Sequence, residues 1–129
     1  MEKYGVGTTD SGVAILRSYW QERGIENSAF RIADGSGLSP QDHVTTYGLV
    51  QALLYAKTRP WFTAFYNALP LYNGMHMKSG TISGVKSFSG YHTAASGRQY
   101  AFSIIVNNYD GDTDSIIHKI YDVLNVLKK

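Results

Sequence analysis

A lysine, a hydroxyl residue and a glycine follow one another in the run Lys78-Ser79-Gly80-Thr81. The run lies in a segment whose apolar residues alternate, as they do in a strand. On a strand, Lys-Ser/Thr-Gly is a motif of serine acyl-transfer chemistry. Three residues are weak evidence by themselves, because a lysine on an exposed sheet edge also discourages sheets from associating. The meaning of this candidate site therefore depends on its surroundings.

Histidines are the other residues that could carry chemistry, at four positions: His43, His76, His92 and His118. None forms a His-x-x-x-His pair or has a carboxylate at ligand spacing, so we expect no metal and no cofactor. His76 shares strand parity with Lys78, and it either lines a cleft there or is an ordinary surface histidine. The ten tyrosines are expected mainly to pack in the core rather than to form a platform for sugars.

The composition is that of one globular domain. A chain of 129 residues has room for a single hydrophobic core, and 43% hydrophobic residues are enough to build one. The formal charge of +2, with no run of like charges, is too weak to argue for nucleic acid. No segment approaches the roughly 18–20 consecutive apolar residues of a membrane span. We expect a single domain over residues 1–129, without a nucleic-acid partner or a transmembrane segment.

The first half of the chain is predicted to be mainly helical. Capping residues at 8–11, helical apolar spacing and Gly24 predict a helix over about residues 10–23. A short strand over residues 30–33 leads into a glycine-rich turn. Ser39-Pro40-Gln41-Asp42 resembles a capping box, so a helix should begin at Pro40 and continue to about Lys57. Pro60 should open another short helix that ends before Pro70.

The second half alternates like strands in three runs, at about residues 75–82, 85–93 and 99–107. The short connections predict hairpins and therefore an antiparallel meander. Asp112 should cap a last helix, whose apolar stripe must cover one face of the sheet. The predicted fold class is α+β: a three-strand antiparallel meander with flanking helices and a C-terminal helix.

Further short runs stand in a fixed order around the Lys78 run. Asp34-Gly35-Ser36-Gly37-Leu38-Ser39 and Leu69-Pro70 precede it, and Gly84-Val85, Gly90-Tyr91, Gly97-Arg98 and residues 100–108 follow it. In this order they resemble the C-terminal part of the D-alanyl-D-alanine carboxypeptidase/endopeptidases of low-molecular-mass class C, a group of penicillin-binding proteins. The resemblance covers nearly all of residues 8–127. It implies the fold of the penicillin-recognising serine transferases, a five-stranded antiparallel sheet flanked by helices.

The resemblance implies a role for each residue of the run. Lys78 would attract the terminal carboxylate of the substrate, Ser79 would donate a hydrogen bond to it, and Gly80 would leave room for close approach. The backbone N–H of Thr81 would form half of an oxyanion hole. Because alternation sends Lys78 and Ser79 to opposite faces, both can serve one ligand only at a sheet edge with the peptide laid alongside.

The Asp34-Gly35-Ser36-Gly37 turn is predicted to be a structural loop near the site rather than a part of the chemistry. Asp34 is expected to accept hydrogen bonds from backbone N–H groups of the glycine turn, as aspartate often does in turns. The glycines permit positive φ angles there.

The sequence departs from the family's pattern at the nucleophile. The family carries its serine in Ser-x-x-Lys at a helix start, where one helical face brings the amine to the hydroxyl. The literal match here, Ser83-Gly84-Val85-Lys86, falls in a predicted hairpin, where serine and lysine three apart face opposite ways. The family's Ser-x-Asn is absent, and the segment between Leu69-Pro70 and Lys78 is shorter than in many members. We therefore expect the chain to be inactive by itself.

The resemblance implies the C-terminal portion of a serine-type D-Ala-D-Ala carboxypeptidase or endopeptidase that works through an acyl-enzyme. The implied partners are peptidoglycan stem peptides ending in D-Ala-D-Ala, β-lactams and the remainder of the parent chain. A periplasmic place in the cell envelope is implied by the family alone, since residues 1–5 hold no signal peptide. Two alternatives stay open: a non-enzymatic module that holds peptidoglycan peptides or a protein on the same strand, and a fragment of a related β-lactamase.

Overall fold

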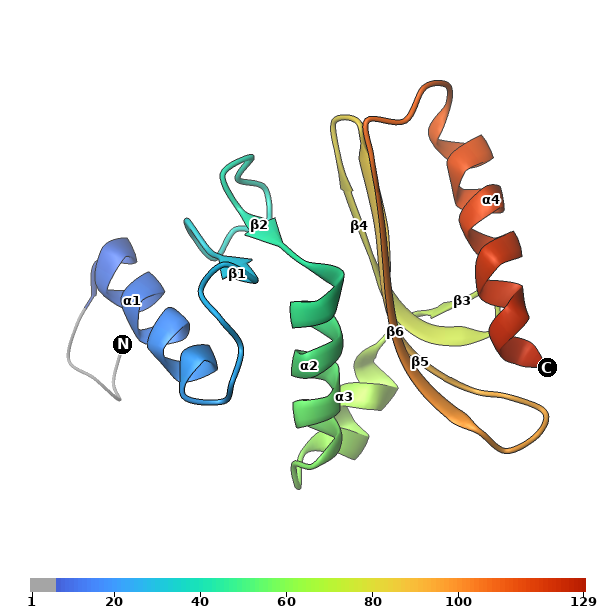
Figure 1. The fold of residues 1–129 in the computed structure, drawn as a ribbon, viewed down its shortest axis with the longest axis horizontal. Coiled ribbons are helices and arrows are strands. Elements are labelled where there is room, and N and C mark those ends of the chain that lie inside the picture. The colour runs from blue at the N-terminus through green and yellow to red at the C-terminus, as the bar shows by residue number, and fades with distance from the viewer. Residues whose placement is uncertain (1–6) are drawn as a thin grey trace. The chain divides into compact units, whose positions relative to one another are not determined.

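The structure, a computed structural model, describes residues 7–129 of the chain. The chain divides into two compact units, Met1–Gly48 and Leu49–Lys129. Figure 1 shows the ribbon with its helices and strands labelled. Within the described residues, no helix is both long enough and apolar enough to cross a membrane.

The first unit is built on α1 (Thr9–Gln21) and a small sheet of two short strands, β1 (Phe30–Arg31) and β2 (His43–Val44). Thr8 caps α1, since its Oγ1 accepts a hydrogen bond of 3.2 Å from the Ser11 N–H. The Trp20 ring meets the Phe30 ring edge-on, with centroids 5.7 Å apart. This helix confirms the one predicted at about residues 10–23, and it ends slightly earlier.

The prediction that a helix begins at Pro40 is wrong. The Asp42 carboxylate accepts a hydrogen bond of 2.6 Å from the Ala33 N–H, across the loop, instead of capping a helix. The next two residues then pair with β1 as the strand β2. The helix α2 begins only at Thr46 and runs to Lys57. Its cap is Thr45, whose Oγ1 accepts a hydrogen bond of 3.0 Å from the Gly48 N–H.

The second unit contains a four-stranded antiparallel sheet in the order β3-β4-β5-β6. The three long strands are β4 (Met75–Ile82), β5 (Val85–Thr93) and β6 (Gln99–Asn107), which confirms the predicted meander with the same bounds. Pairing of Ile82 with Val85 leaves a two-residue hairpin loop between β4 and β5. Gly84 in that loop has a φ of 69°, a conformation that glycine adopts without strain.

The strand β3 (Leu71–Tyr72) was not predicted from the sequence. It has two residues and pairs with the start of β4. The two strands are joined by Asn73-Gly74, both of which have positive φ. Asn-Gly with positive φ at both positions is the favoured two-residue hairpin turn, so a local signal for β3 was present in the sequence.

One face of the sheet packs on α4 (Thr113–Leu124), which continues into a 3-10 turn, η1 (Asn125–Lys128). Asp112 caps α4 as predicted, with its Oδ1 accepting from the Ser115 N–H at 2.8 Å. The buried cluster between helix and sheet consists of Met75, Met77, Phe88, Phe102, Ile116, Ile120 and Leu124. This cluster is the core of the unit.

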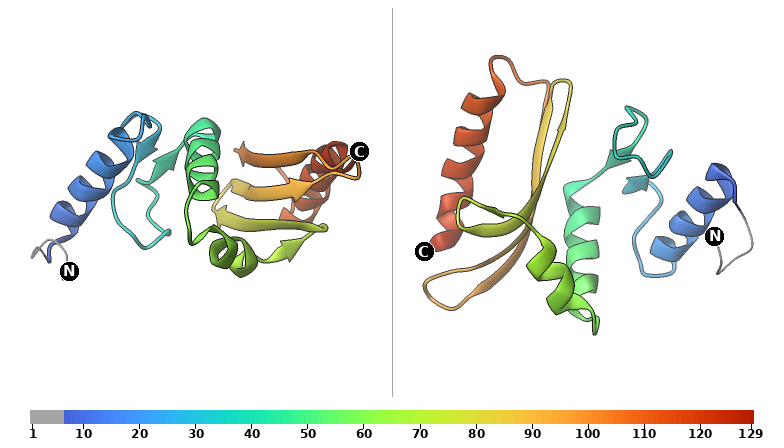
Figure 2. Two further views of the ribbon diagram at one scale, coloured as in Figure 1. Left: turned by 90° about the horizontal axis from the view of Figure 1, so that it is seen from below. Right: turned by 180° about the vertical axis from the view of Figure 1, so that it is seen from behind.

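The other face packs on α2 and on α3 (Phe62–Ala68), so that the sheet lies between α4 and the α2–α3 pair (Figure 2). Tyr91 of β5 is the main contact. Its ring centroid lies 5.2 Å from that of Phe62, and its hydroxyl donates a hydrogen bond of 2.7 Å to the Leu53 carbonyl. The observed fold is therefore α+β, with helices on both faces of an antiparallel sheet.

Candidate functional site

The predicted requirement that the Lys78 strand be a sheet edge is met over most of β4. On its outer side β4 pairs with β3 only at Met75 and His76, and the Met77 N–H adds a hydrogen bond of 3.0 Å to the Pro70 carbonyl. Beyond that point, Lys78–Ile82 pairs with β5 on one side and with no other strand of residues 7–129 on the other. This stretch is one free edge of the sheet, called the free edge below, and the outer side of β6 is the other.

The backbone groups on the free edge follow from the pairing of Met77. In an antiparallel strand, the N–H and C=O of one residue point to the same side, and successive residues alternate. Because the Met77 N–H points outward to Pro70, the backbone groups of Ser79 and Thr81 also point outward. An extended ligand along this edge would therefore meet the N–H and C=O groups of these two residues.

Lys78 is exposed at the free edge, and its Nζ donates a hydrogen bond of 2.8 Å to the Ser79 carbonyl. None of the described carboxylates lies within ion-pair distance of it. Acidic residues are also absent from the sequence between Asp42 and Asp110, a stretch that contains five cationic residues: Lys57, Arg59, Lys78, Lys86 and Arg98. The strands β4, β5 and β6 therefore carry two cationic side chains, Lys78 and Lys86, and no acidic one, which favours a positive potential at the edge.

Small polar residues line the sheet beside Lys78. Lys78 is paired with Ser89, whose Oγ lies 2.8 Å from the Oγ of Ser103 on β6. Gly80 is paired with Ser87, and a Cβ at Gly80 would lie only 2.6 Å from the Ser87 Oγ. Glycine at position 80 therefore lets the Ser87 hydroxyl sit over the β4 backbone, next to the free edge.

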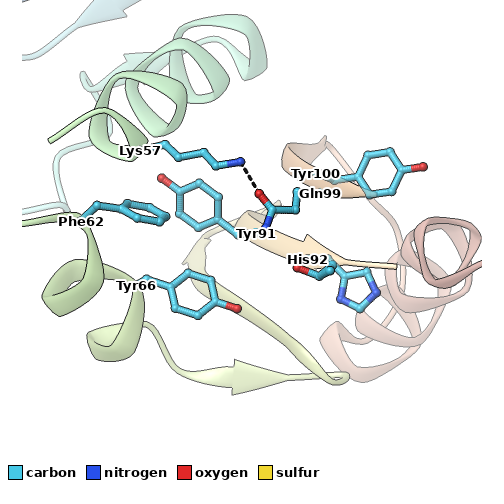
Figure 3. A pocket seen from close by; sticks show the side chains of 8 residues that line it. Lys57, Phe62, Tyr66, Tyr91, His92, Gln99 and Tyr100 are labelled. Atoms are coloured by element: carbon cyan, nitrogen blue, oxygen red, sulfur yellow. Dashed lines mark hydrogen bonds between the residues drawn. The ribbon is translucent and has the colours of Figure 1, made fainter. Parts of the chain in front are cut away.

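A cavity of about 270 Å³ lies further along the same unit, at the end of β5 and the start of β6 (Figure 3). It is lined by Lys57, Phe62, Tyr66, Tyr91, His92, Thr93, Gln99 and Tyr100. The Lys57 Nζ donates a hydrogen bond of 2.6 Å to Gln99 Oε1 across its mouth. No sequence signal connects these two residues, which lie on α2 and β6, and the cavity was not predicted.

The aromatic wall of the cavity is close to the Lys78 edge. Tyr91 is paired with His76, two positions along β4 from Lys78 and on the same face. Burial raises the pKa of the Tyr91 hydroxyl to about 12. His76 is half-buried and stacks on Tyr66, with ring centroids 4.2 Å apart. Its Nδ1 is buried and has no hydrogen-bond partner among the described residues, so it packs more closely than an ordinary surface histidine.

The Asp34-Gly35-Ser36-Gly37 loop belongs to the first unit, whereas β4 belongs to the second. Asp34 Oδ1 accepts a hydrogen bond of 2.8 Å from the Ser36 N–H, as the turn chemistry predicts. Hydrogen bonds from the Ser36 side chain and backbone hold the pKa of the Asp34 carboxyl below its usual value. The expected neighbourhood of this loop and the Lys78 strand stays a prediction.

The Ser83-x-x-Lys86 match does not bring its two side chains together. Ser83 is exposed in the β4–β5 hairpin, whereas Lys86 is buried within β5. The Lys86 Nζ instead donates a hydrogen bond of 2.7 Å to Thr81 Oγ1. Among the described residues, no group of three or more His, Asp or Glu side chains is arranged to hold a metal ion.

Comparison with known proteins gives one consistent set of matches. The family model described as D-Ala-D-Ala carboxypeptidase 3 (S13) matches residues 1–126. The D-alanyl-D-alanine carboxypeptidase of Actinomadura sp. (strain R39) is 31% identical over 131 residues, which cover 85% of this chain and 24% of that protein. Crystal structures of penicillin binding protein 4 from Haemophilus influenzae, one of them complexed with a β-lactam, match with a TM-score of 0.78 and 23% identity.

These matches cover most of this chain but a minor part of each relative. The match to the β-lactam complex covers 94% of this chain and 33% of that one. The chain thus spans about a quarter of the length of the curated relative and a third of the solved structure.

Proposed function

Because the chain belongs to the D-Ala-D-Ala carboxypeptidase 3 (S13) family, we propose that it supplies the substrate-binding edge strand of a serine-type D-Ala-D-Ala carboxypeptidase. The observation that carries this proposal is the free edge Lys78–Ile82, with its exposed ammonium and outward backbone groups. The rest of a longer chain, of which this is the C-terminal portion in our proposal, provides the nucleophilic serine. The substrate is a peptidoglycan stem peptide ending in D-Ala-D-Ala, and the site lies in the cell envelope.

The first step in the proposal is capture of the substrate's carboxylate by Lys78. In the free chain the Lys78 ammonium is bound to the Ser79 carbonyl. A carboxylate accepts a stronger, charge-assisted hydrogen bond, so it displaces that carbonyl. The Ser79 carbonyl is then free to accept an N–H of the peptide laid along the edge. Gly80 places no side chain between the peptide and the strand.

The second step is stabilisation of the reacting carbonyl by the outward Thr81 N–H. During acyl transfer, the serine oxygen from the rest of the chain attacks the carbonyl carbon between the two D-Ala residues, and negative charge develops on the carbonyl oxygen. A fixed backbone N–H that meets this oxygen lowers the barrier. The terminal D-Ala leaves, and water then hydrolyses the serine ester. A β-lactam acts as an alternative acyl donor at the same edge.

The test is made in the natural polypeptide that carries this chain, with Lys78→Ala. We expect kcat/KM for an acyl-D-Ala-D-Ala peptide to fall about tenfold to a hundredfold, the value of a hydrogen bond to a charged group. Lys119→Ala, which removes the same charge from an exposed position on α4, is the matched control and should leave the rate unchanged. An unchanged rate in Lys78→Ala would overturn the proposal.

Other outcomes distinguish the alternatives. Saturable binding of the peptide without hydrolysis, lost in Lys78→Ala, would favour a non-enzymatic binding module. Rapid turnover of penicillin rather than of the peptide would favour a β-lactamase. Hydrolysis by residues 1–129 alone, abolished by Ser83→Ala, would place the nucleophile in the hairpin and contradict the assignment of that role to the rest of the chain.

A further inference from the structure

Lys86 is the one charged side chain of the described residues that the fold buries, with 6% of its surface exposed. Its Nζ donates a hydrogen bond of 2.7 Å to Thr81 Oγ1 and lies 5.1 Å from the centre of the Phe88 ring. Lysine is almost never buried unless it is paired, because removing an ammonium from water is costly. A buried lysine whose partner is a single hydroxyl therefore calls for an explanation.

Ion pairing does not supply that explanation. The salt bridge found among residues 7–129 joins Arg23 and Glu22, in the other unit. The sequence around Lys86 also has no acidic residue between Asp42 and Asp110. The Lys86 charge is thus held by the Thr81 hydroxyl and the face of an aromatic ring, both of which are weaker partners than a carboxylate.

The position of Thr81 connects Lys86 to the free edge. Thr81 and Lys86 are directly paired across β4 and β5, so their side chains lie on the same face of the sheet, the face of Phe88. The Thr81 N–H lies in the plane of the sheet instead and points out of the free edge, because the backbone groups alternate from Met77 onward. Lys86 therefore binds the side chain of Thr81, the residue whose N–H would face a ligand at the edge.

Thr81 lies at a weakly supported place in the sheet, so a contact that fixes its conformation matters there. It is exposed, it has a strand on only one side, and the β4–β5 hairpin loop begins two residues later. Strand ends with few buried contacts and solvent-exposed hydrogen bonds are the parts that open most easily. A donor that stabilises developing charge works only when its direction is fixed before the reaction.

We propose that Lys86 is a positioning residue for the Thr81 N–H, acting through the Thr81 hydroxyl from the α4 face of the sheet, opposite to the face that carries Lys78. This inference rests on the proposed function of the free edge. The Lys86–Thr81 hydrogen bond fixes the side-chain rotamer of Thr81 and with it the peptide plane at the edge.

The first experiment measures the order of the edge, independently of any ligand. Nitrogen-15 relaxation of residues 1–129 is compared for the unaltered chain and for Lys86→Met, which keeps the length of the side chain and removes the ammonium. We expect the order parameter of the Thr81 amide to fall from about 0.85 towards 0.6. The Ser79 amide also points outward, but the Lys86 hydrogen bond goes to Thr81, so the Ser79 amide is the internal control and should not change. Equal order at Thr81 in both chains would overturn the proposal.

The second experiment is a double-mutant cycle on the hydrolysis of the acyl-D-Ala-D-Ala peptide by the natural polypeptide. Lys86→Met and Thr81→Val should each lower kcat about tenfold with little change in KM, since the contact is made in the transition state. If Lys86 acts through Thr81, the double variant should be no slower than either single variant. Thr81→Ser retains the hydroxyl and should lose less of the rate than Thr81→Val.

Two results would contradict a positioning role. Additive losses in the double variant would mean that Lys86 does not act through Thr81. A lower melting temperature with unchanged kcat would mean that the pair only stabilises the hairpin. The proposed function is tested separately by Lys78→Ala: if that variant is inactive while Lys86→Met keeps full kcat, the edge role stands and the positioning role fails. If Lys78→Ala is fully active, the proposed function itself fails.

Discussion

The two faces of the β4–β6 sheet are built from the same three strands but differ in chemistry. The face that packs on α4 carries fully buried apolar side chains such as Met77 and Phe88. The face toward α2 and α3 carries Lys78, Gly80 and the hydrogen-bonded pair Ser89 and Ser103 beside the free edge. Apolar burial on the first face stabilises the fold, and in our proposal the small polar groups on the second face exchange partners with a ligand. One step of alternation along each strand separates the two tasks.

Lys86 is the exception that connects the faces. By its position it belongs with the apolar face, and its ammonium interrupts that face only to reach Thr81 at the edge. The comparison therefore predicts that changes on the α4 face alter stability, whereas changes at the edge alter ligand chemistry, with Lys86 affecting the edge from the apolar side.

The largest loss of stability is expected when Gly90 of β5 is replaced by alanine. A Cβ at Gly90 would overlap the His76 carbonyl oxygen and the Met77 backbone, neither of which can move without shifting β4. Gly90→Ala should therefore lower the free energy of unfolding by about 4 kcal/mol or more. Gly80→Ala is the matched control, because the new Cβ there would meet only the end of the Ser87 side chain. Urea unfolding measures the stability of both variants. Similar losses in Gly90→Ala and Gly80→Ala would contradict the expected difference between the two positions.

The strands of this unit were predictable because several local signals agree. Alternation and a glycine hairpin give β4, β5 and β6 their observed bounds. The first unit was less predictable, because the role of Asp42 depends on a residue nine positions away. Its carboxylate accepts a hydrogen bond from the Ala33 N–H instead of capping a helix, and a capping-box pattern contains no information about Ala33. The two-residue strand β3 was missed because two residues show no period, although Asn73-Gly74 marked the turn.

The residues of the candidate site are a prediction from the sequence, whereas the contacts around them were found only in the structure. The Lys78 run is recognisable as a motif, and parity along β4 predicts which side chains share a face. The hydrogen bond between Lys86 and Thr81 was not predicted, although alternation from Phe88 places Lys86 on the buried face. Burial of a lysine contradicts its usual preference, and only the tertiary fold reveals it. The Lys57–Gln99 contact, between α2 and β6, had no sequence signal at all.

A smaller effect is expected in the helix that covers the apolar face. Ile120 of α4 is 2% exposed and belongs to the buried cluster, whereas Val123 on the same helix is 59% exposed. Ile120→Ala should lower the free energy of unfolding by about 3 kcal/mol, through lost burial and the cavity left behind. Val123→Ala should cost less than about 1 kcal/mol. Equal losses in urea unfolding would mean that α4 does not pack on the sheet through the Ile120 side.

The smallest of the three effects is expected at Tyr91, on the opposite face. Tyr91→Phe removes the hydroxyl that donates to the Leu53 carbonyl, and loss of this one hydrogen bond should cost about 1 kcal/mol. The same variant has a pH signature. Since burial raises the pKa of Tyr91 in the folded chain to about 12 from 10.0, the folded state binds more protons than the unfolded state between these values. Stability must therefore fall as the pH rises through that window.

Urea unfolding at about pH 8 and about pH 11 measures this dependence, and Tyr91→Phe should reduce the loss of stability between the two. Part of the loss should persist in the variant, because burial also raises the pKa of Tyr121, which packs against Phe88 on the α4 face. Tyr121→Phe is thus the control from the other side of the sheet. If Tyr91→Phe leaves the pH dependence unchanged, the pKa of Tyr91 is the same in the folded and unfolded states. The contact between α2 and β5 would then be looser than the buried Tyr91 hydroxyl implies.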